Sequence, residues 1–173
     1  MRRRMLCKFG PLSNVDADFI IFPFQDEHTV MMVILPEEQS GVDHVLRNLH
    51  NVKVKNIMRD TEKTNLDVSI PKFKIETETN LIEPMKKLGM TDMFLDSANF
   101  SRISNDRLAV DKIIQKVNIE VNELGSSATG ATALSLESRS MAEEYQINRP
   151  FLFLIVTKGL VIFSGVITDP SHI

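Results

Sequence analysis

Two uninterrupted apolar runs in the first part of the chain predict a β-hairpin. Residues 19–22 read FIIF and residues 29–35 read TVMMVIL, and the polar residues 25–28 separate them. A strand that is covered on both faces carries continuous rather than alternating apolar side chains. We therefore expect both strands to lie inside a sheet, with Pro36 ending the second one.

The residues that follow change to the period of a helix. Ser40, with Asp43 three residues later, has the pattern of a helix start. The helical face that comes next is expected to pack on the core rather than to bind a ligand, and it consists of Val42, Val45, Leu46 and Leu49. A weaker second helix is predicted in residues 51–60.

The middle of the chain predicts a strand that changes phase at a proline. Apolar and polar residues alternate in residues 66–70, and the alternation resumes one position later from Phe73 onward. A proline lacks the amide hydrogen that a strand ladder needs, so Pro71 predicts a bulge or a sheet edge. A short helix is then expected between the capping residue Asn80 and Gly89.

The last part of the chain predicts a long strand and a second hairpin. Residues 90–107 are typical of a loop, and residues 108–123 are expected to form one strand that ends in alternating apolar and polar positions. The apolar runs 151–156 and 160–167 are expected to pair across a tight turn at Lys158-Gly159. Most of the predicted elements are therefore strands.

Composition and charge suit one globular domain with a core of its own. The chain has 173 residues, 43% of them hydrophobic, and a formal net charge of -3. No apolar stretch reaches the roughly 18 residues of a membrane span. The basic run Arg2-Arg3-Arg4 is interpreted as a solvated terminus rather than a phosphate-binding patch. Neither nucleic acid nor a membrane is expected as a partner.

No pattern of catalytic or metal-binding residues stands out. His28, His44, His50 and His172 lack the spacing of a metal site. Cys7 is the single cysteine, so an intrachain disulfide is excluded and the redox compartment stays open. Cys7 also lacks the His or Asp partner pattern of a catalytic thiol. The sequence therefore predicts no enzyme, no catalytic residues, no metal and no cofactor.

A stretch of small residues separates the long strand from the closing hairpin. Residues 126–133 contain only Ser, Ala, Thr and Gly, which on composition alone is typical of a flexible linker. Its place between two predicted strands favours another interpretation. A strand made of such small side chains can enter an existing sheet without colliding with bulky neighbours.

Five ordered motifs give the chain a resemblance to the serpins, serine-protease inhibitors that trap their target by changing shape. The motifs are IPKFKIET at 70–77, LGMTDMF at 88–94, IEVNE at 119–123 with Gly125 after it, NRPFLFL at 148–154 and FSGV at 163–166. The resemblance runs from about Phe19 to Pro170 and implies an α+β fold, mostly β-sheets with a few short helices and an exposed reactive-centre loop at about 124–148. Because serpins are more than twice as long, it also implies that residues 1–173 are the C-terminal part of a single serpin domain, truncated on the N-terminal side.

The resemblance also implies a reactive bond between Arg139 and Ser140. In serpins the residue that the protease cuts after is the seventeenth from the hinge glutamate, here Glu123, and the separation from Pro150 agrees with this count. A slip of one position would place Ser138 or Ser140 in the specificity position instead. An arginine there suits a trypsin-like serine protease, whose specificity pocket ends in an aspartate.

The hinge implied by the resemblance begins at Glu123 and has neither bulk nor charge in its inserting part. That part consists of Gly125, Ser126, Ala128, Thr129, Gly130, Ala131 and Thr132. Leu124 departs from the pattern, because inhibitory serpins usually carry an acidic residue there. The implied mechanism is suicide-substrate inhibition by loop cleavage and insertion into the central sheet. The alternative left open is a non-inhibitory serpin-like interaction protein or an inert truncated fragment.

The remaining expectations concern glycosylation, cellular location and self-association. The sequence at Asn99, Phe100 and Ser101 is an N-glycosylation sequon, which matters only if the chain enters the secretory pathway. The first ten residues do not resemble a signal peptide. An extracellular location is expected for the full-length parent, with a cytoplasmic one left open. Self-association is expected through exposed strand edges, above all that of residues 108–123.

Overall fold

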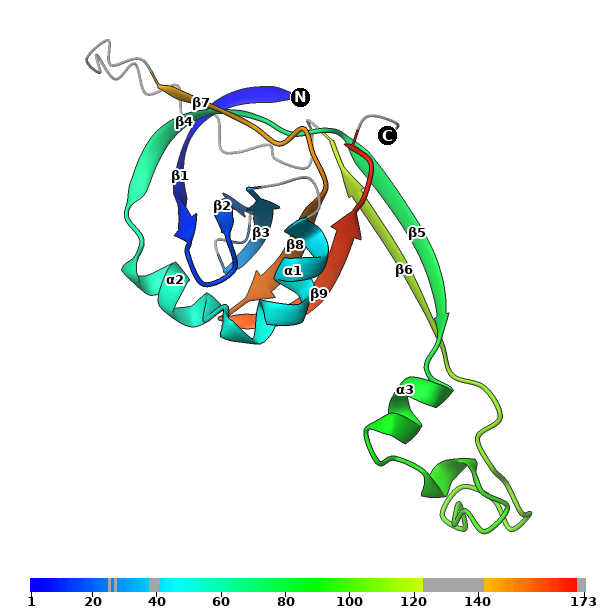
Figure 1. Cartoon of the computed structure of the whole chain (residues 1–173). Helices are drawn as coiled ribbons and strands as arrows, with labels where there is room; N and C mark the ends of the chain where they lie inside the picture. The colour runs from blue at the N-terminus through cyan, green and yellow to red at the C-terminus, as the bar shows by residue number, and fades with distance from the viewer. Residues whose placement is uncertain (25, 27, 38–40, 123–141, 171–173) are drawn as a thin grey trace. The chain divides into compact units, whose positions relative to one another are not determined.

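The structure is a computed structural model that describes residues 1–24, 26, 28–37, 41–122 and 142–170. The chain divides into two compact units, which are described separately. The first contains Met1–Phe73 and Glu120–Ile173, and the second contains Lys74–Ile119. Strands dominate the described residues and the helices are short, which confirms the predicted α+β class (Figure 1).

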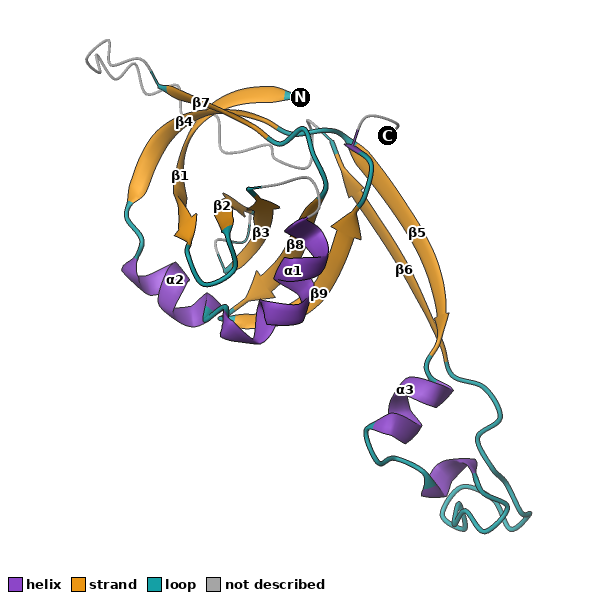
Figure 2. Ribbon diagram, in the orientation of Figure 1, coloured by secondary structure: helices purple, strands orange, loops and turns teal. Residues whose placement is uncertain are grey.

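A seven-stranded sheet forms the body of the first unit (Figure 2), in the order β7-β4-β1-β2-β3-β8-β9. Neighbouring strands are antiparallel except β4 and β7, which are parallel. Strands from the two ends of the chain thus lie side by side, because β3 pairs with β8. The strands are β1 (Arg2–Leu12), β2 (Ala17–Pro23), β3 (Thr29–Pro36), β4 (Lys63–Ser69), β7 (Glu143–Gln146), β8 (Phe151–Thr157) and β9 (Leu160–Ile167).

Both predicted hairpins are confirmed. β2 pairs with β3, and the central residues of β3 have no exposed surface, as their continuous apolar run predicted. β8 pairs with β9 across Lys158 and Gly159, which have φ angles of 50° and 77°. Two successive positive φ angles give the turn the twist that suits a two-residue hairpin, and a glycine adopts such an angle without steric cost.

Helices cover one face of this sheet. α1 (Gly41–Asn48) buries Val42 and Val45 against alternate side chains of β2, β3 and β8. The predicted face is wrong at Leu46, which is 44% exposed, because Val42 and Val45 alone complete the contact of this short helix. A 3-10 turn (Leu49–Asn51) leads into α2 (Val54–Asp60), the predicted second helix. Ser40, the expected helix start, lies outside the described residues.

The N-terminal residues correct the interpretation of the basic run as a solvated terminus. β1 lies between β4 and β2, and the backbone of Arg2, Arg3 and Arg4 pairs with β4. The arginine side chains are exposed, whereas their peptide groups pair with the backbone of β4. A run of charged residues therefore forms part of a strand. Further along β1, Cys7 is buried, and burial raises the pKa of its thiol to about 11 because it disfavours the thiolate.

The strand predicted on both sides of Pro71 is wrong as a single element. β4 ends at Ser69 in the seven-stranded sheet, and β5 (Phe73–Asn80) begins a different, two-stranded sheet. Since proline cannot donate to a ladder, the chain changes sheets at Pro71 instead of bulging within one. Phe73 still packs in the first unit, with ring centroids 6.0 Å from Phe151 and 5.5 Å from Phe153.

The second unit contains most of β5 and of β6 (Ile114–Val121), which pair with each other and run in opposite directions (Figure 2). The strand predicted for residues 108–123 is too long, since β6 begins only at Ile114. The predicted short helix is α3 (Ile82–Lys87), and Asn80 Oδ1 accepts a hydrogen bond from the Ile82 amide. Its end at Gly89 is confirmed by a φ angle of 86°. A 3-10 turn (Asp92–Phe94) follows.

A glycine in β9 gives a stability prediction. A Cβ atom at Gly165 would lie 2.4 Å from the nearest ring atom of the buried Phe153. Gly165→Ala is expected to lower the free energy of unfolding by about 1–3 kcal/mol, since an overpacked core must shift. Urea unfolding measures this loss, and Ser164→Ala, at an exposed neighbouring position, is the control that should stay within about 0.5 kcal/mol of the parent. Equal stability of the two variants would contradict the packing account.

Candidate functional site

All residues predicted for the hinge and the reactive bond lie outside the described residues. These are Glu123, Gly125, Ser126, Ala128, Thr129, Gly130, Ala131, Thr132, Arg139 and Ser140. The structure describes what flanks them. Residues 123–141, called the reactive segment below, join β6 of the two-stranded sheet to β7 of the seven-stranded sheet. The described part of the site therefore consists of β6, which precedes the reactive segment, and β7, which follows it.

The flank before the reactive segment is β6, which has the alternation expected of a strand with one covered face. Val117, Ile119 and Val121 are partly buried, whereas Asn118 and Glu120 are exposed. Within the part of the chain that the structure describes, β6 has one strand neighbour, β5. None of the other described strands pairs with the second edge of β6.

Polar side chains join β6 to β5 across the hairpin. Lys116 Nζ lies 3.1 Å from Glu78 Oε2, and Asn118 Nδ2 donates a hydrogen bond of 3.4 Å to Glu76 Oε1. Lys116 and Glu78 are more than half exposed, so the ion pair contributes about 1 kcal/mol at most. The pairing of β6 with β5 therefore depends mainly on the backbone ladder.

The flank after the reactive segment is β7, which an aromatic residue anchors on one face. The Tyr145 hydroxyl donates to Asp18 Oδ2 at 3.1 Å, and its ring meets Phe9 edge-on at 4.8 Å between centroids. Burial, with the charge of Asp18 beside it, raises the pKa of Tyr145 above its ordinary value. The phenol therefore stays protonated and keeps donating its hydrogen bond at neutral pH.

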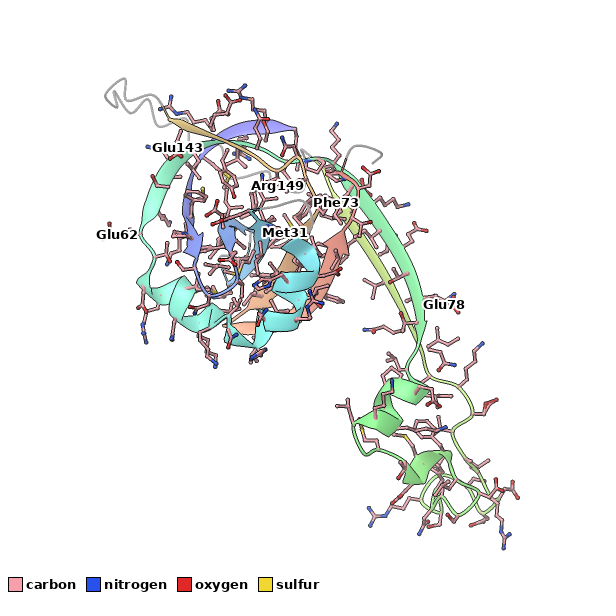
Figure 3. All side chains as sticks on the ribbon, viewed as in Figure 1. Met31, Glu62, Phe73, Glu78, Glu143 and Arg149 are labelled. Atoms are coloured by element: carbon pink, nitrogen blue, oxygen red, sulfur yellow. The ribbon has the colours of Figure 1, made fainter. Side chains whose placement is uncertain are left out.

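The residues between β7 and β8 continue this anchor. The Ile147 amide donates to the Ser69 carbonyl oxygen at 2.8 Å, and the Ile147 side chain is buried. Arg149 Nε donates to the Pro36 carbonyl oxygen at 2.6 Å. Figure 3 marks Glu143 on β7 and Arg149 in the connection to β8. The C-terminal flank is therefore held at successive points along the chain.

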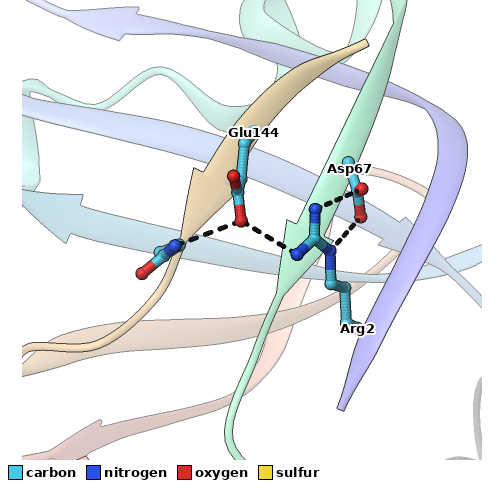
Figure 4. Close-up of polar contacts among 4 residues, drawn as sticks. Arg2, Asp67 and Glu144 are labelled. Atoms are coloured by element: carbon cyan, nitrogen blue, oxygen red, sulfur yellow. Dashed lines mark hydrogen bonds and ion pairs between the residues drawn. The ribbon is translucent and has the colours of Figure 1, made fainter.

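On the opposite face of β7, one arginine bridges three strands (Figure 4). Arg2 Nε and Nη2 donate to the two carboxylate oxygens of Asp67 at 3.0 and 2.7 Å. Arg2 Nη1 lies 3.1 Å from Glu144 Oε1. The hydrogen bond from Arg2 lowers the pKa of Asp67, so this carboxylate remains charged throughout the neutral range.

Three anchoring residues, Arg2, Tyr145 and Arg149, were not identified from the sequence. β7 has four residues, too few for a clear alternation, and Arg2 lies in a run interpreted as solvated. Tyr145 is the only tyrosine of the chain. A lone aromatic residue between the polar residues Glu144 and Gln146 was the one available signal for a buried anchor.

The other expectations concern modification, metals and membranes. Asn99 is exposed, and its Oδ1 accepts a hydrogen bond of 3.1 Å from the Ser101 amide, so the sequon stays a prediction. Among the residues that the structure describes, no group of three or more His, Cys, Asp or Glu side chains could hold a metal ion. No described helix is long and apolar enough to cross a membrane.

Comparison with known sequences identifies the family. The family model described as "Serpin (serine protease inhibitor)" matches residues 1–170. Serine proteinase inhibitor 2 of Variola virus is 31% identical over 166 residues, which cover 94% of this chain and 46% of the relative. Human glia-derived nexin is 36% identical over 159 residues, which cover 88% of this chain and 40% of the relative. The chain thus spans less than half the length of these relatives.

Solved structures agree with the sequence comparison. Uncleaved ovalbumin superposes with a TM-score of 0.83 at 27% identity, over 98% of this chain and 47% of ovalbumin. A cleaved form of Serpin 42Da superposes with a TM-score of 0.78 at 26% identity, over 96% of this chain and 46% of that one. The motifs, the fold and the relatives lead to one conclusion: the chain belongs to the serpin family.

Proposed function

We propose that this chain carries the reactive segment of a serine-protease inhibitor that acts once, as a suicide substrate. The observation that carries the proposal is the connection of the reactive segment, which joins the open-edged strand β6 to the anchored strand β7. A segment with these two flanks can be cut near β7 and then move toward β6. Relatives named as serine proteinase inhibitors support the same class of function.

The proposed reactive bond lies between Arg139 and Ser140, and the proposed target is a trypsin-like serine protease. The arginine side chain would form a charge-assisted, bidentate hydrogen bond with an aspartate at the base of the specificity pocket. The protease serine would attack the Arg139 carbonyl carbon and form an ester. The amide bond would break, and Ser140 would leave as a new amino terminus, still attached to β7.

Cleavage would free the hinge to enter the sheet beside β6. Residues 123–138 would form the new strand, and the hinge from Gly125 to Thr132 carries no bulky or charged side chain that would have to be buried. About ten new ladder hydrogen bonds, at roughly 1 kcal/mol net each, would contribute on the order of 10 kcal/mol. Inhibition would succeed when insertion is faster than hydrolysis of the ester.

The proposal extends to the domain and to its location. Residues 1–173 would be the C-terminal part of one serpin domain, with an extracellular site of action for the full-length parent. The reactive-centre loop, predicted at about 124–148, would end where β7 begins at Glu143. A second candidate, a non-inhibitory serpin-like interaction protein, is favoured by Leu124, which replaces the acidic residue usual in inhibitory serpins. Stable complex formation with a protease separates the two candidates.

The test compares residues 1–173 with a version extended by the N-terminal half of a serpin relative. Each is mixed with trypsin and analysed on a denaturing gel. The extended protein is expected to form a covalent complex, whereas residues 1–173 alone are expected to be cut without trapping, because β6 has only β5 beside it among the described strands. Self-association through the open edge of β6 is expected to show in size-exclusion chromatography.

Two results would contradict this proposal. A monomer of residues 1–173 that forms a stable complex with trypsin would show that insertion does not need a second strand beside β6. Cleavage of the extended protein with full recovery of active trypsin would favour the non-inhibitory candidate.

A further inference from the structure

The strand that follows the reactive segment is weakly held by its own backbone. β7 has four residues, lies at the edge of the seven-stranded sheet and has β4 as its one neighbour among the described strands. Glu143, Glu144 and Gln146 are exposed. Short edge strands with few buried contacts open more easily than central strands. The attachment of β7 therefore depends on side chains.

Two acidic residues oppose this attachment. Asp67 on β4 and Glu144 on β7 are direct partners in the parallel ladder, so their side chains lie on the same face. Like charges at directly opposed positions destabilise strand pairing. Without a cation between them, this pair of carboxylates would weaken the contact between β4 and β7.

Arg2 supplies that cation from a third strand. Its Nε and Nη2 hold both oxygens of Asp67, and its Nη1 remains for Glu144, so three nitrogens serve two carboxylates. Arg4 is the ladder partner of Asp67 on β1 and adds positive charge on the same side. Gln146 Nε2 donates to the same Glu144 oxygen at 3.2 Å. Arg2, in contrast, links Glu144 to both β1 and β4.

We infer that Arg2 is a positioning residue that fastens β7, and through it the C-terminal end of the reactive segment, to the sheet. Tyr145 anchors one face of β7, and the guanidinium of Arg2 anchors the other. A lysine ammonium is a point charge without the planar fork, so it cannot hold both carboxylates in this geometry. The effect on the cut bond rests on the function proposed above, whereas the fastening of β7 does not.

The fastening is tested by hydrogen exchange on the whole chain. Arg2→Lys and Glu144→Gln are each expected to speed amide exchange in residues 143–146 by about threefold to tenfold, a range set by the modest strength of exposed ion pairs. The double variant is expected to match Glu144→Gln and to exchange more slowly than Arg2→Lys, because it lacks the link but also lacks the repulsion between Glu144 and Asp67. Exchange in β2 and β3 should not change, which separates local opening of β7 from global unfolding.

Arg59→Lys is the matched control. Arg59 binds both oxygens of Asp60 at 2.6 and 3.0 Å, but the two residues are neighbours in α2 and join no strands. This variant is expected to leave exchange in β7 at the parent rate. Unchanged exchange in both the Arg2 and the Glu144 variants, or an equal increase in the Arg59 variant, would overturn the inference.

A second readout connects the fastening to the reactive segment. In Arg2→Lys, trypsin cleavage after Arg139 is expected to show a KM raised by about twofold to fivefold with an unchanged kcat. The reason is that a less ordered segment loses more conformational entropy when it binds trypsin. An unchanged KM together with faster exchange would overturn the inference that the fastening of β7 positions the reactive segment. A parent chain that trypsin never cuts after Arg139 would instead refute the proposed function, and the exchange result would stand.

Discussion

Arg139→Ala is expected to slow trypsin cleavage of the reactive segment by at least about a thousandfold, because the specificity pocket of trypsin is left with an unpaired buried aspartate. The fold is expected to be unaffected, since the predicted role of Arg139 lies in contact with the protease alone. Mass spectrometry after brief digestion measures the effect through the amino terminus that appears at Ser140.

Arg107→Ala is the control for this experiment, as it removes an exposed arginine outside the reactive segment. It should leave the rate of cleavage after Arg139 at the parent value. A first cut at another position within residues 123–141 would defeat the assignment of the reactive bond. A cut that persists at Ser140 in the Arg139 variant would show that the arginine does not direct the protease.

Thr129→Arg is expected to convert the completed inhibitor into a substrate. In the proposed mechanism residue 129 enters a sheet, and a long charged side chain must then be buried or held out of register. Burying an unpaired charge costs several kcal/mol, which is enough to make insertion slower than hydrolysis of the ester. The ratio of cleaved protein to covalent complex on a denaturing gel measures the change.

Thr129→Ser keeps a small uncharged side chain and should preserve complex formation. Both variants are made in the version extended by the N-terminal half, in which insertion is expected. A Thr129→Arg variant that still forms as much stable complex as the parent would contradict the insertion step, while leaving the assignment of Arg139 intact.

The sequence predicted the strands whose continuous apolar runs are buried, and the tight turn of the closing hairpin. The apolar runs at 19–22 and 29–35 form β2 and β3, and the turn at Lys158-Gly159 has the two positive φ angles of a tight hairpin. In these elements the pattern and the environment agree, because continuous apolar residues require two covered faces. Family membership followed from motifs spread over nearly the whole chain.

Strands that lack a local apolar pattern were harder to predict. β1 begins with three exposed arginines, and β7 reads as a short polar segment, yet both are strands of the same sheet. Their partners are distant in sequence, since β1 pairs with β4 and β4 with β7. No local pattern reports such pairing, which explains why the anchors Arg2 and Tyr145 were missed.

The break at Pro71 shows a third kind of limit. The sequence predicted a disturbed strand there, and the physical reason, a missing amide hydrogen, was the right one. It could not distinguish a bulge from a change of sheet, because that choice depends on what Phe73 packs against. Phe73 lies beside Phe151 and Phe153, about eighty positions later in the chain.

The most direct test of the central claim is the product analysis of the extended protein after reaction with trypsin. The account predicts one covalent complex that survives denaturation, together with a released peptide that begins at Ser140 and ends at Ile173. Arrest of trypsin as an ester on Arg139 would explain both products at once. A released peptide that begins elsewhere, or complete cleavage after Arg139 with no covalent complex, would contradict the claim that this segment traps its protease.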